Sequence, residues 1–171
     1  MKIKSMTICA LLSAINVVLS ILAPIKLANF KFTFEAFPIL VGAIMFGPNM
    51  GLLVGTLGSL IYQIFFSGYG FTITTPLWVL PHALSGLIVG LYVKKHNYNL
   101  NKKQLITITI LSALLVTILN TLAQYIDAYI FEYPYTLVLL TTIMKIVSGI
   151  IQSIIYALII DKLIKRMNIK L

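Results

Sequence analysis

Lys145 is the residue whose position in this chain most needs a chemical explanation. It lies within a long apolar stretch, where an ionised lysine costs roughly 2.5–3.5 kcal/mol even on a lenient insertion scale. Ser148 and Gln152 follow it on the same helical face. A cation kept from water in this way is a suitable partner for a carboxylate or phosphate. We therefore predict that Lys145 binds the anionic group of a small molecule.

Two other apolar stretches carry polar side chains at a similar depth. A helical rise of about 1.5 Å per residue, counted from the predicted outer ends, places His82, Asn120 and Lys145 roughly 10–14 Å into the membrane. Three spans with polar groups at one level predict a pocket that opens to the outside. The predicted ligand-binding residues, which include a carboxylate and two loop aromatics, are Glu35, Gln63, Tyr69, Phe71, Trp78, His82, Asn120, Gln124 and Lys145.

Several of these side chains also have a purely structural interpretation. Asn120 and Gln124 could form hydrogen bonds between helices, which contribute about 0.6 kcal/mol on average. Trp78 could belong to an interfacial aromatic belt. His82 could be an interior histidine that has its hydrogen-bond partners within the protein. Lys145 is harder to explain in this way, because a charge within a span indicates function by default.

The sequence lacks the common catalytic templates. It has no HExxH motif, no paired carboxylates within a span, no P-loop and no Gly-x-Ser-x-Gly motif. Cys9 is the single cysteine, so neither a disulfide nor a thiol metal site is expected. We predict no enzyme activity, no cofactor and no metal. Without a P-loop, import against a gradient needs either an ion gradient or a partner protein.

The composition is that of an integral membrane protein. The 171 residues are 60% hydrophobic and 10% charged, and their mean hydropathy is +1.01, whereas soluble domains average roughly 25% charged residues. At about 20 residues per span, the length allows five or six helices. We predict an all-α bundle of six transmembrane helices that forms one domain, residues 1–171. The spans are expected at about 5–23, 34–46, 50–66, 75–93, 105–128 and 136–160.

The basic residues predict the orientation of this bundle. Six spans place both termini on one side, together with the polar stretch 94–104. Ten lysines and arginines then share that side, and Lys26 and Lys31 lie on the other. The positive-inside rule therefore predicts a multi-pass protein of the cell membrane with cytoplasmic termini and with loops 24–33, 67–74 and 129–135 outside. This distribution argues against nucleic acid as a partner, although the net charge is +9.

Glycines predict a close helix contact in the third span. Gly51, Gly55 and Gly58 lie along one helical stripe. Within a membrane, such a stripe lets the backbone of a neighbouring helix approach closely. A Gly-Pro-Asn turn at residues 47–49 precedes this span, and the loop after it lies where a lid over the pocket would lie.

Five segments resemble a known family. They are FPILVGAIMFGPNMG, LVGTLGSLI, GYGFTITTPLWVLPHALSGLIVGLY, LNTLAQYIDAYIF and MKIVSGIIQSIIY. Together they are similar to the substrate-binding S components of energy-coupling factor (ECF) vitamin importers, most of all to the folate-type group. Ala10 and Ala14 in the first span are similar to the AxxxA motif through which the family contacts its coupling protein, although they could also pack internally.

The resemblance implies a mechanism and partners. The protein would bind a water-soluble vitamin from outside and deliver it through a coupling protein and two cytosolic ATPases. Folate is the first choice, and pantothenate, a vitamin B6 form, cobalamin or another micronutrient stay open. Two alternatives belong to other classes. A small membrane-embedded enzyme should show a nucleophile or a metal-ligand cluster, and a structural membrane protein should not keep a lysine within a span.

Overall fold

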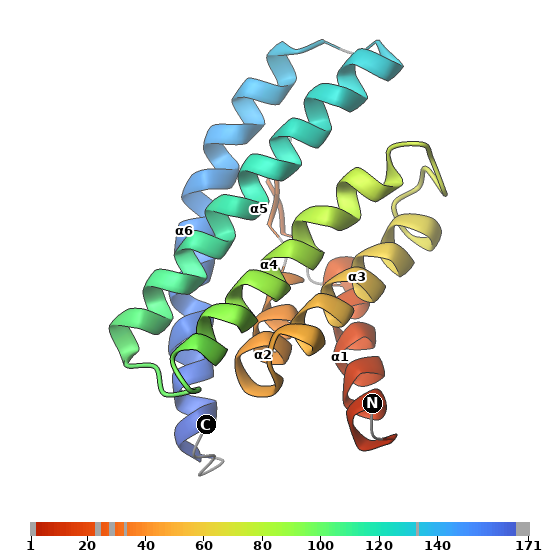
Figure 1. The fold of residues 1–171 in the computed structure, drawn as a ribbon. Helices are drawn as coiled ribbons and strands as arrows, with labels where there is room; N and C mark the ends of the chain where they lie inside the picture. The colour runs from red at the N-terminus through yellow and green to blue at the C-terminus, as the bar shows by residue number, and fades with distance from the viewer. Residues whose placement is uncertain (1–2, 23–24, 28–29, 33, 133, 167–171) are drawn as a thin grey trace.

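The computed structural model describes residues 3–22, 25–27, 30–32, 34–132 and 134–166. Six helices and one short hairpin make up this described part of the chain (Figure 1). In chain order the elements are α1 (Ile3–Leu22), β1 (Ile25–Leu27), β2 (Phe30–Phe32), α2 (Ala36–Phe46), α3 (Pro48–Phe65), α4 (Thr75–Lys95), α5 (Lys102–Phe131) and α6 (Thr136–Arg166).

Each of the six predicted spans coincides with one helix, which confirms the predicted fold class. By length and composition, α1, α4, α5 and residues 142–166 of α6 could cross a membrane. Three predicted boundaries are wrong by three or more residues. Helix α5 begins at Lys102 and continues through Phe131, so it extends three residues past the predicted span at each end, and the predicted loop 129–135 begins too early. Helix α6 continues through residues 161–166, past the predicted end of the sixth span at residue 160. Lys2 and Lys170, which the charge argument used, lie outside the described residues.

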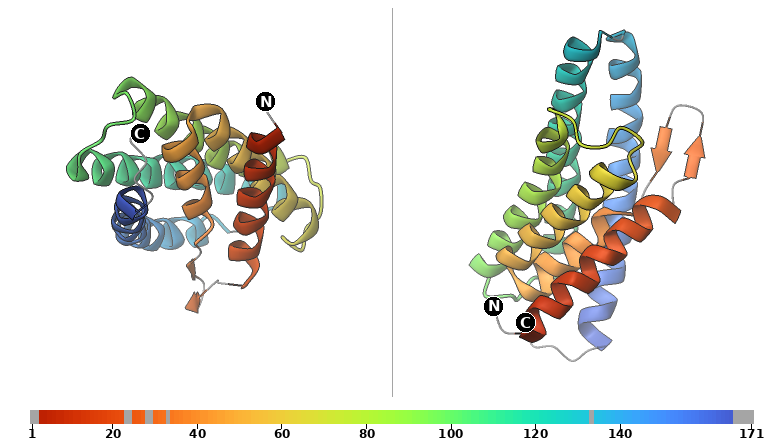
Figure 2. Two further views of the ribbon diagram at one scale, coloured as in Figure 1. Left: turned by 90° about the horizontal axis from the view of Figure 1, so that it is seen from below. Right: turned by 90° about the vertical axis from the view of Figure 1, so that its right-hand side faces the viewer.

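The predicted loop 24–33 contains a hairpin that sequence analysis did not find. β1 and β2 are antiparallel, with Lys26 opposite Lys31. Figure 2 shows the hairpin next to the end of α1, on the side of the bundle away from the start of that helix. Alternating apolar residues over only three positions per strand are too short a pattern to predict a strand.

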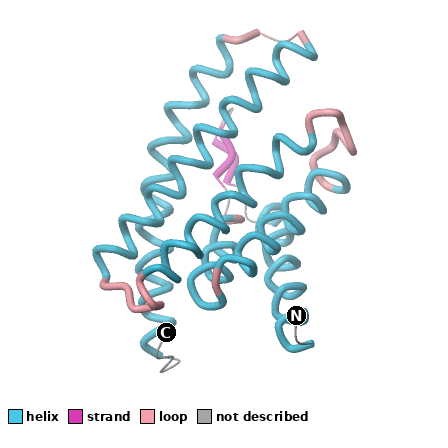
Figure 3. The backbone as a smooth tube through the Cα atoms, viewed as in Figure 1, coloured by secondary structure: helices cyan, strands magenta, loops and turns pink. Residues whose placement is uncertain are grey.

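The connections lie at two opposite ends of the bundle (Figure 3). We call one the basic end, because the start of α1, the α4–α5 connection and the end of α6 bring Lys94, Lys95, Lys102, Lys165 and Arg166 there. At this end, Asn101 caps α5 by accepting a hydrogen bond from the backbone N–H of Gln104 at 2.9 Å. The other, the aromatic end, carries the α3–α4 loop and the α5–α6 connection, with Tyr69 and Tyr135 exposed.

Helix α2 is about half as long as a membrane crossing. Its 11 residues rise about 16 Å, whereas the hydrocarbon core of a bilayer is about 30 Å thick. Gly47 ends it with a φ of 92°, and Pro48 begins α3 directly afterwards. Because α2 occupies only the half of the bundle near the basic end, its first residues lie in the middle of the protein.

Helices α3 and α4 pack with their backbones in close approach. A Cβ atom on Gly51 or Gly86 would overlap the backbone of the other residue, and a Cβ atom on Gly55 would overlap the carbonyl of His82. The predicted role of the glycine stripe is thereby confirmed at these positions. The apolar core lies toward the basic end, between α2, α4, α5 and α6. It includes Leu40, Ile44, Val89, Val93, Leu105, Ile108, Tyr156 and Ile160.

Candidate functional site

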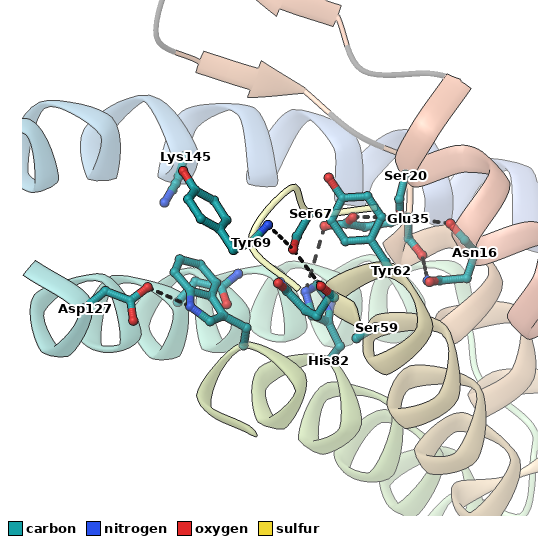
Figure 4. A pocket seen from close by; sticks show the side chains of 13 residues that line it. Asn16, Ser20, Glu35, Ser59, Tyr62, Ser67, Tyr69, His82, Asp127 and Lys145 are labelled. Carbon is teal, nitrogen blue, oxygen red and sulfur yellow. Dashed lines mark hydrogen bonds and ion pairs between the residues drawn. The ribbon is translucent and has the colours of Figure 1, made fainter. Parts of the chain in front are cut away.

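A cavity of about 320 Å³ lies in the half of the bundle toward the aromatic end (Figure 4). We call it the main cavity. Every helix, or the residue just before it, contributes to its wall, and the space exists because α2 is short. The residues that line it are Asn16, Ser20, Glu35, Ser59, Tyr62, Gln63, Ser67, Tyr69, Trp78, His82, Asn120, Asp127 and Lys145.

Glu35 is held on one side of the main cavity by α1 and α4. Ser20 donates a hydrogen bond to its Oε2 atom at 2.9 Å, and the Nδ2 atom of Asn16 donates to its backbone carbonyl at 2.6 Å. Nε2 of His82 lies 3.8 Å from Oε1 of Glu35. Because Glu35 immediately precedes the half-length α2, its carboxylate lies within the bundle instead of at the membrane surface.

The opposite side of the cavity contains a second carboxylate. Nε1 of Trp78 donates a hydrogen bond to Oδ2 of Asp127 at 2.8 Å, which fixes the indole of α4 against α5. Figure 4 shows Asp127 and Lys145 on one side of the view, and Asn16, Ser20 and Glu35 on the other. A ligand that fills the cavity would therefore extend between two differently charged walls.

Three buried polar atoms of residues that line the main cavity have no hydrogen-bond partner. They are Nδ1 of His82, Oδ1 of Asn120 and Oδ1 of Asp127. A buried polar atom without a partner costs about 1–3 kcal/mol. The two oxygens can only accept hydrogen bonds, and the imidazole nitrogen accepts in one tautomer. The cavity is thus suited to a guest that carries N–H or O–H donors.

Lys145 carries no ion pair within the part of the chain that the structure describes. The ion pairs there are Glu35 with His82 and Asp161 with Lys165. Asp127, the other carboxylate of the cavity, binds Trp78 through its Oδ2 atom. Since neither cavity carboxylate forms an ion pair with Lys145, its ammonium group is available to an anion.

The structure brings seven of the nine predicted binding residues together around the main cavity. Gln124 is not among them. It lines an adjoining space of about 570 Å³ between the α3–α4 loop, the start of α4 and the end of α5. Phe71 lines neither space, and 69% of its surface is exposed. His82, Asn120 and Lys145, which were predicted at a common depth, all line the main cavity, and their binding roles stay predictions.

Sequence analysis missed six of the residues that line the cavity. They are Asn16, Ser20, Ser59, Tyr62, Ser67 and Asp127. Asn16 and Ser20 lie one turn apart in an apolar helix, and this spacing could have revealed the polar face of α1. No local pattern relates α1 to Glu35, because their contact depends on where the chain returns after the hairpin.

Ala10 and Ala14 lie on an exposed face of α1. They do not pack in the interior of the bundle, which was the alternative interpretation of this pair. Leu11 and Val18 are exposed on the same helix. This face is available to a lipid or to a partner protein.

The described residues do not form a set of metal ligands. Within the described ranges, His, Cys, Asp and Glu residues form no group of three or more that could hold a metal ion. The cavity therefore offers hydrogen bonds, one ammonium group and aromatic surface.

Comparisons with known proteins agree with this architecture. Residues 4–163 match a family described as "ECF transporter, substrate-specific component". Two solved structures share the fold. One is the "S-component for biotin from an ECF-type ABC transporter", with a TM-score of 0.73, 17% identity, and coverage of 96% of this chain and 92% of that chain. The other is "the S component of a bacterial ECF transporter", with a TM-score of 0.66, 20% identity, and coverage of 98% and 97%. No curated protein sequence matches the chain.

Proposed function

The chain belongs to the family of ECF transporter substrate-specific components, and we propose that it binds a small vitamin that carries an acid group in the main cavity. Members of this family are substrate-binding subunits of transporters and not enzymes. The chain is accordingly a membrane protein whose task is to recognise a small molecule.

The observation that carries the proposal is the unpaired ammonium group of Lys145 in the wall of a cavity of ligand size. Cavities that bind small molecules have volumes of about 300–1,000 Å³, and the main cavity has about 320 Å³. Trp78 and Tyr62 add aromatic surface to the same wall. An acid group at Lys145 and N–H or O–H donors toward Asn120 and Asp127 would satisfy the groups that lack partners.

Among vitamins, folate remains the first candidate because of the sequence resemblance. Biotin is the ligand named for one structural relative, whose 17% identity establishes the fold alone. Both are carboxylic acids, as pantothenate is, so Lys145 is compatible with each. A vitamin B6 form and cobalamin complete the set of candidates.

Delivery would require partners. The chain has no P-loop, and we propose that it docks on a membrane-embedded coupling protein driven by two cytosolic ATPases. The exposed pair Ala10 and Ala14 on α1 is the proposed contact, because small side chains let another helix approach closely. The basic end would face the cytoplasm, and the main cavity would open to the outside.

Equilibrium dialysis of the purified protein tests the proposed function. The protein in lipid nanodiscs is dialysed separately against radiolabelled folate, biotin, pantothenate, pyridoxal 5′-phosphate and cobalamin. We expect saturable retention of one compound, which an excess of the same unlabelled compound displaces. Retention of none of the five would contradict the proposal that this chain binds a vitamin.

A further inference from the structure

A second cavity of about 160 Å³ continues from the main cavity toward the basic end. It lies between α2, α4, α5 and α6, and four residues line both spaces: Glu35, His82, Asn120 and Lys145. These four residues form the junction between the two cavities. A molecule in the main cavity can therefore extend through the junction into the second cavity.

The walls of the second cavity include hydroxyl oxygens that can accept hydrogen bonds. The hydroxyl of Thr117 donates to the carbonyl of Ala113 at 2.9 Å, and that of Ser148 donates to the carbonyl of Lys145 at 3.1 Å. Since each hydroxyl has one proton and two lone pairs, the oxygens keep capacity to accept. Oδ1 of Asn120, at the junction, is buried and has no partner.

Gly149 provides a second and independent observation. A glycine within a helix costs about 1 kcal/mol relative to alanine. In α3 and α4, Gly51 and Gly86 are required because a Cβ atom would overlap a neighbouring backbone. A Cβ atom on Gly149 would meet only Ala113 Cβ at 3.6 Å and Thr117 Oγ1 at 3.7 Å, which are ordinary contacts.

Packing between helices therefore does not require a glycine at position 149. The missing side chain leaves space in the wall of the second cavity, to which Gly149 contributes. An apolar residue would fill this space and stabilise α6, so the space is retained at a cost in stability.

We propose that the second cavity is a binding subsite for the uncharged end of the substrate, and that this end carries N–H or O–H donors. The body of the substrate would lie in the main cavity with its acid group near Lys145, and an amide, ureide or hydroxyl-bearing group would extend past the junction among the acceptors of α5 and α6. A volume of about 160 Å³ equals that of about five water molecules in the liquid. The inference rests on the proposed function.

Substitutions of Gly149 test whether the substrate occupies this space. The vitamin that the wild-type protein retains in dialysis is titrated into Gly149→Ala and Gly149→Leu in nanodiscs. We expect Gly149→Ala to raise the melting temperature of the ligand-free protein by roughly 2–4 °C, because alanine is the better helix former. The same variant should bind the vitamin more weakly, and Gly149→Leu should lose at least about tenfold in affinity because its side chain fills the subsite.

Alkylation of an introduced cysteine gives a readout that does not depend on substitutions of Gly149. In a Cys9→Ala background, Ala113→Cys places a thiol in the wall of the second cavity. Iodoacetamide should modify it in the ligand-free protein, and the bound vitamin should slow the reaction at least about fivefold. Asn97→Cys, in the exposed α4–α5 connection at the basic end, is the control, whose rate the vitamin should leave unchanged.

Two results separate this inference from the proposed function. If a vitamin binds Gly149→Leu as it binds the wild type, or if it gives the Ala113→Cys thiol no protection, the second cavity is not a substrate subsite and the proposed function stands. If none of the five vitamins binds the wild-type protein, both proposals fail.

Discussion

Replacing Lys145 with methionine tests the proposed recognition of an acid. Methionine keeps an unbranched apolar side chain of similar length and removes the charge. The carboxylates of the main cavity are already engaged, Glu35 with His82 and Ser20, and Asp127 with Trp78. The acid group of the ligand would therefore be the principal partner of the ammonium group, and the variant leaves that acid without one.

The expected loss follows from the environment of this pair. Truncating one partner of a buried, hydrogen-bonded charge pair costs about 2–5 kcal/mol. Lys145 is half-buried in the wall of an open cavity, so we expect the lower part of this range, about 2–4 kcal/mol. Because each 1.4 kcal/mol corresponds to a factor of ten, the dissociation constant should rise about 30- to 700-fold.

Isothermal titration calorimetry in nanodiscs measures this change. The vitamin that binds the wild-type protein is titrated into Lys145→Met and into Lys103→Met, a control at the basic end that should bind like the wild type. The neutral amide derivative of the same vitamin should bind Lys145→Met about as well as it binds the wild type. Equal losses for the acid and the amide, or an unchanged affinity for the acid, would refute the assignment of Lys145 to the anion. The ligand-free variant should be at least as stable, since it no longer holds a charge within a span.

Three further predictions concern the partner face, the orientation and the helix contact. Ala10→Trp and Ala14→Trp should abolish vitamin uptake in cells and leave the affinity of the purified protein unchanged, since bulk on α1 holds a partner helix away; a parallel loss of binding would assign the pair to folding. In intact cells with Cys9 replaced by alanine, a membrane-impermeant maleimide should label Tyr69→Cys but not Asn97→Cys, and labelling of the latter from outside would invert the topology. Gly86→Ala should lower stability by about 1–3 kcal/mol, because its Cβ atom overlaps the α3 backbone. Thermal unfolding measures this loss of stability. Gly149→Ala, which should not be destabilised, is the control.

The helices could be predicted from the sequence because each span is long, apolar and bounded by polar or turn-forming residues. The glycine contact between α3 and α4 was also predictable in part. The stripe of Gly51 and Gly55 indicated a close neighbour, although only the fold identifies that neighbour as Gly86 and the carbonyl of His82.

The candidate site was less accessible to sequence analysis. A similar membrane depth could be predicted for His82, Asn120 and Lys145 by counting residues along the spans, because the helical rise per residue is regular. The cluster of Asn16, Ser20 and Glu35 depends on a different kind of information. It forms because the chain re-enters the bundle after the hairpin and begins α2 halfway through it, and no periodicity encodes that position.

The half-length of α2 also bears on how a protein of this kind can change over generations. The apolar contacts that hold the bundle together lie toward the basic end, around Leu40, Ile44 and Val93. The wall of the main cavity lies toward the aromatic end and includes no residue of α2 itself. Substitutions in the wall of the main cavity should therefore alter selectivity with little effect on folding. The second cavity shares Leu40 and Tyr156 with the apolar core, so substitutions of these two residues should alter both. Ligand selectivity and folding stability, which compete in many proteins, thus depend largely on different residues of this chain. Two structural relatives keep this architecture at 17% and 20% identity.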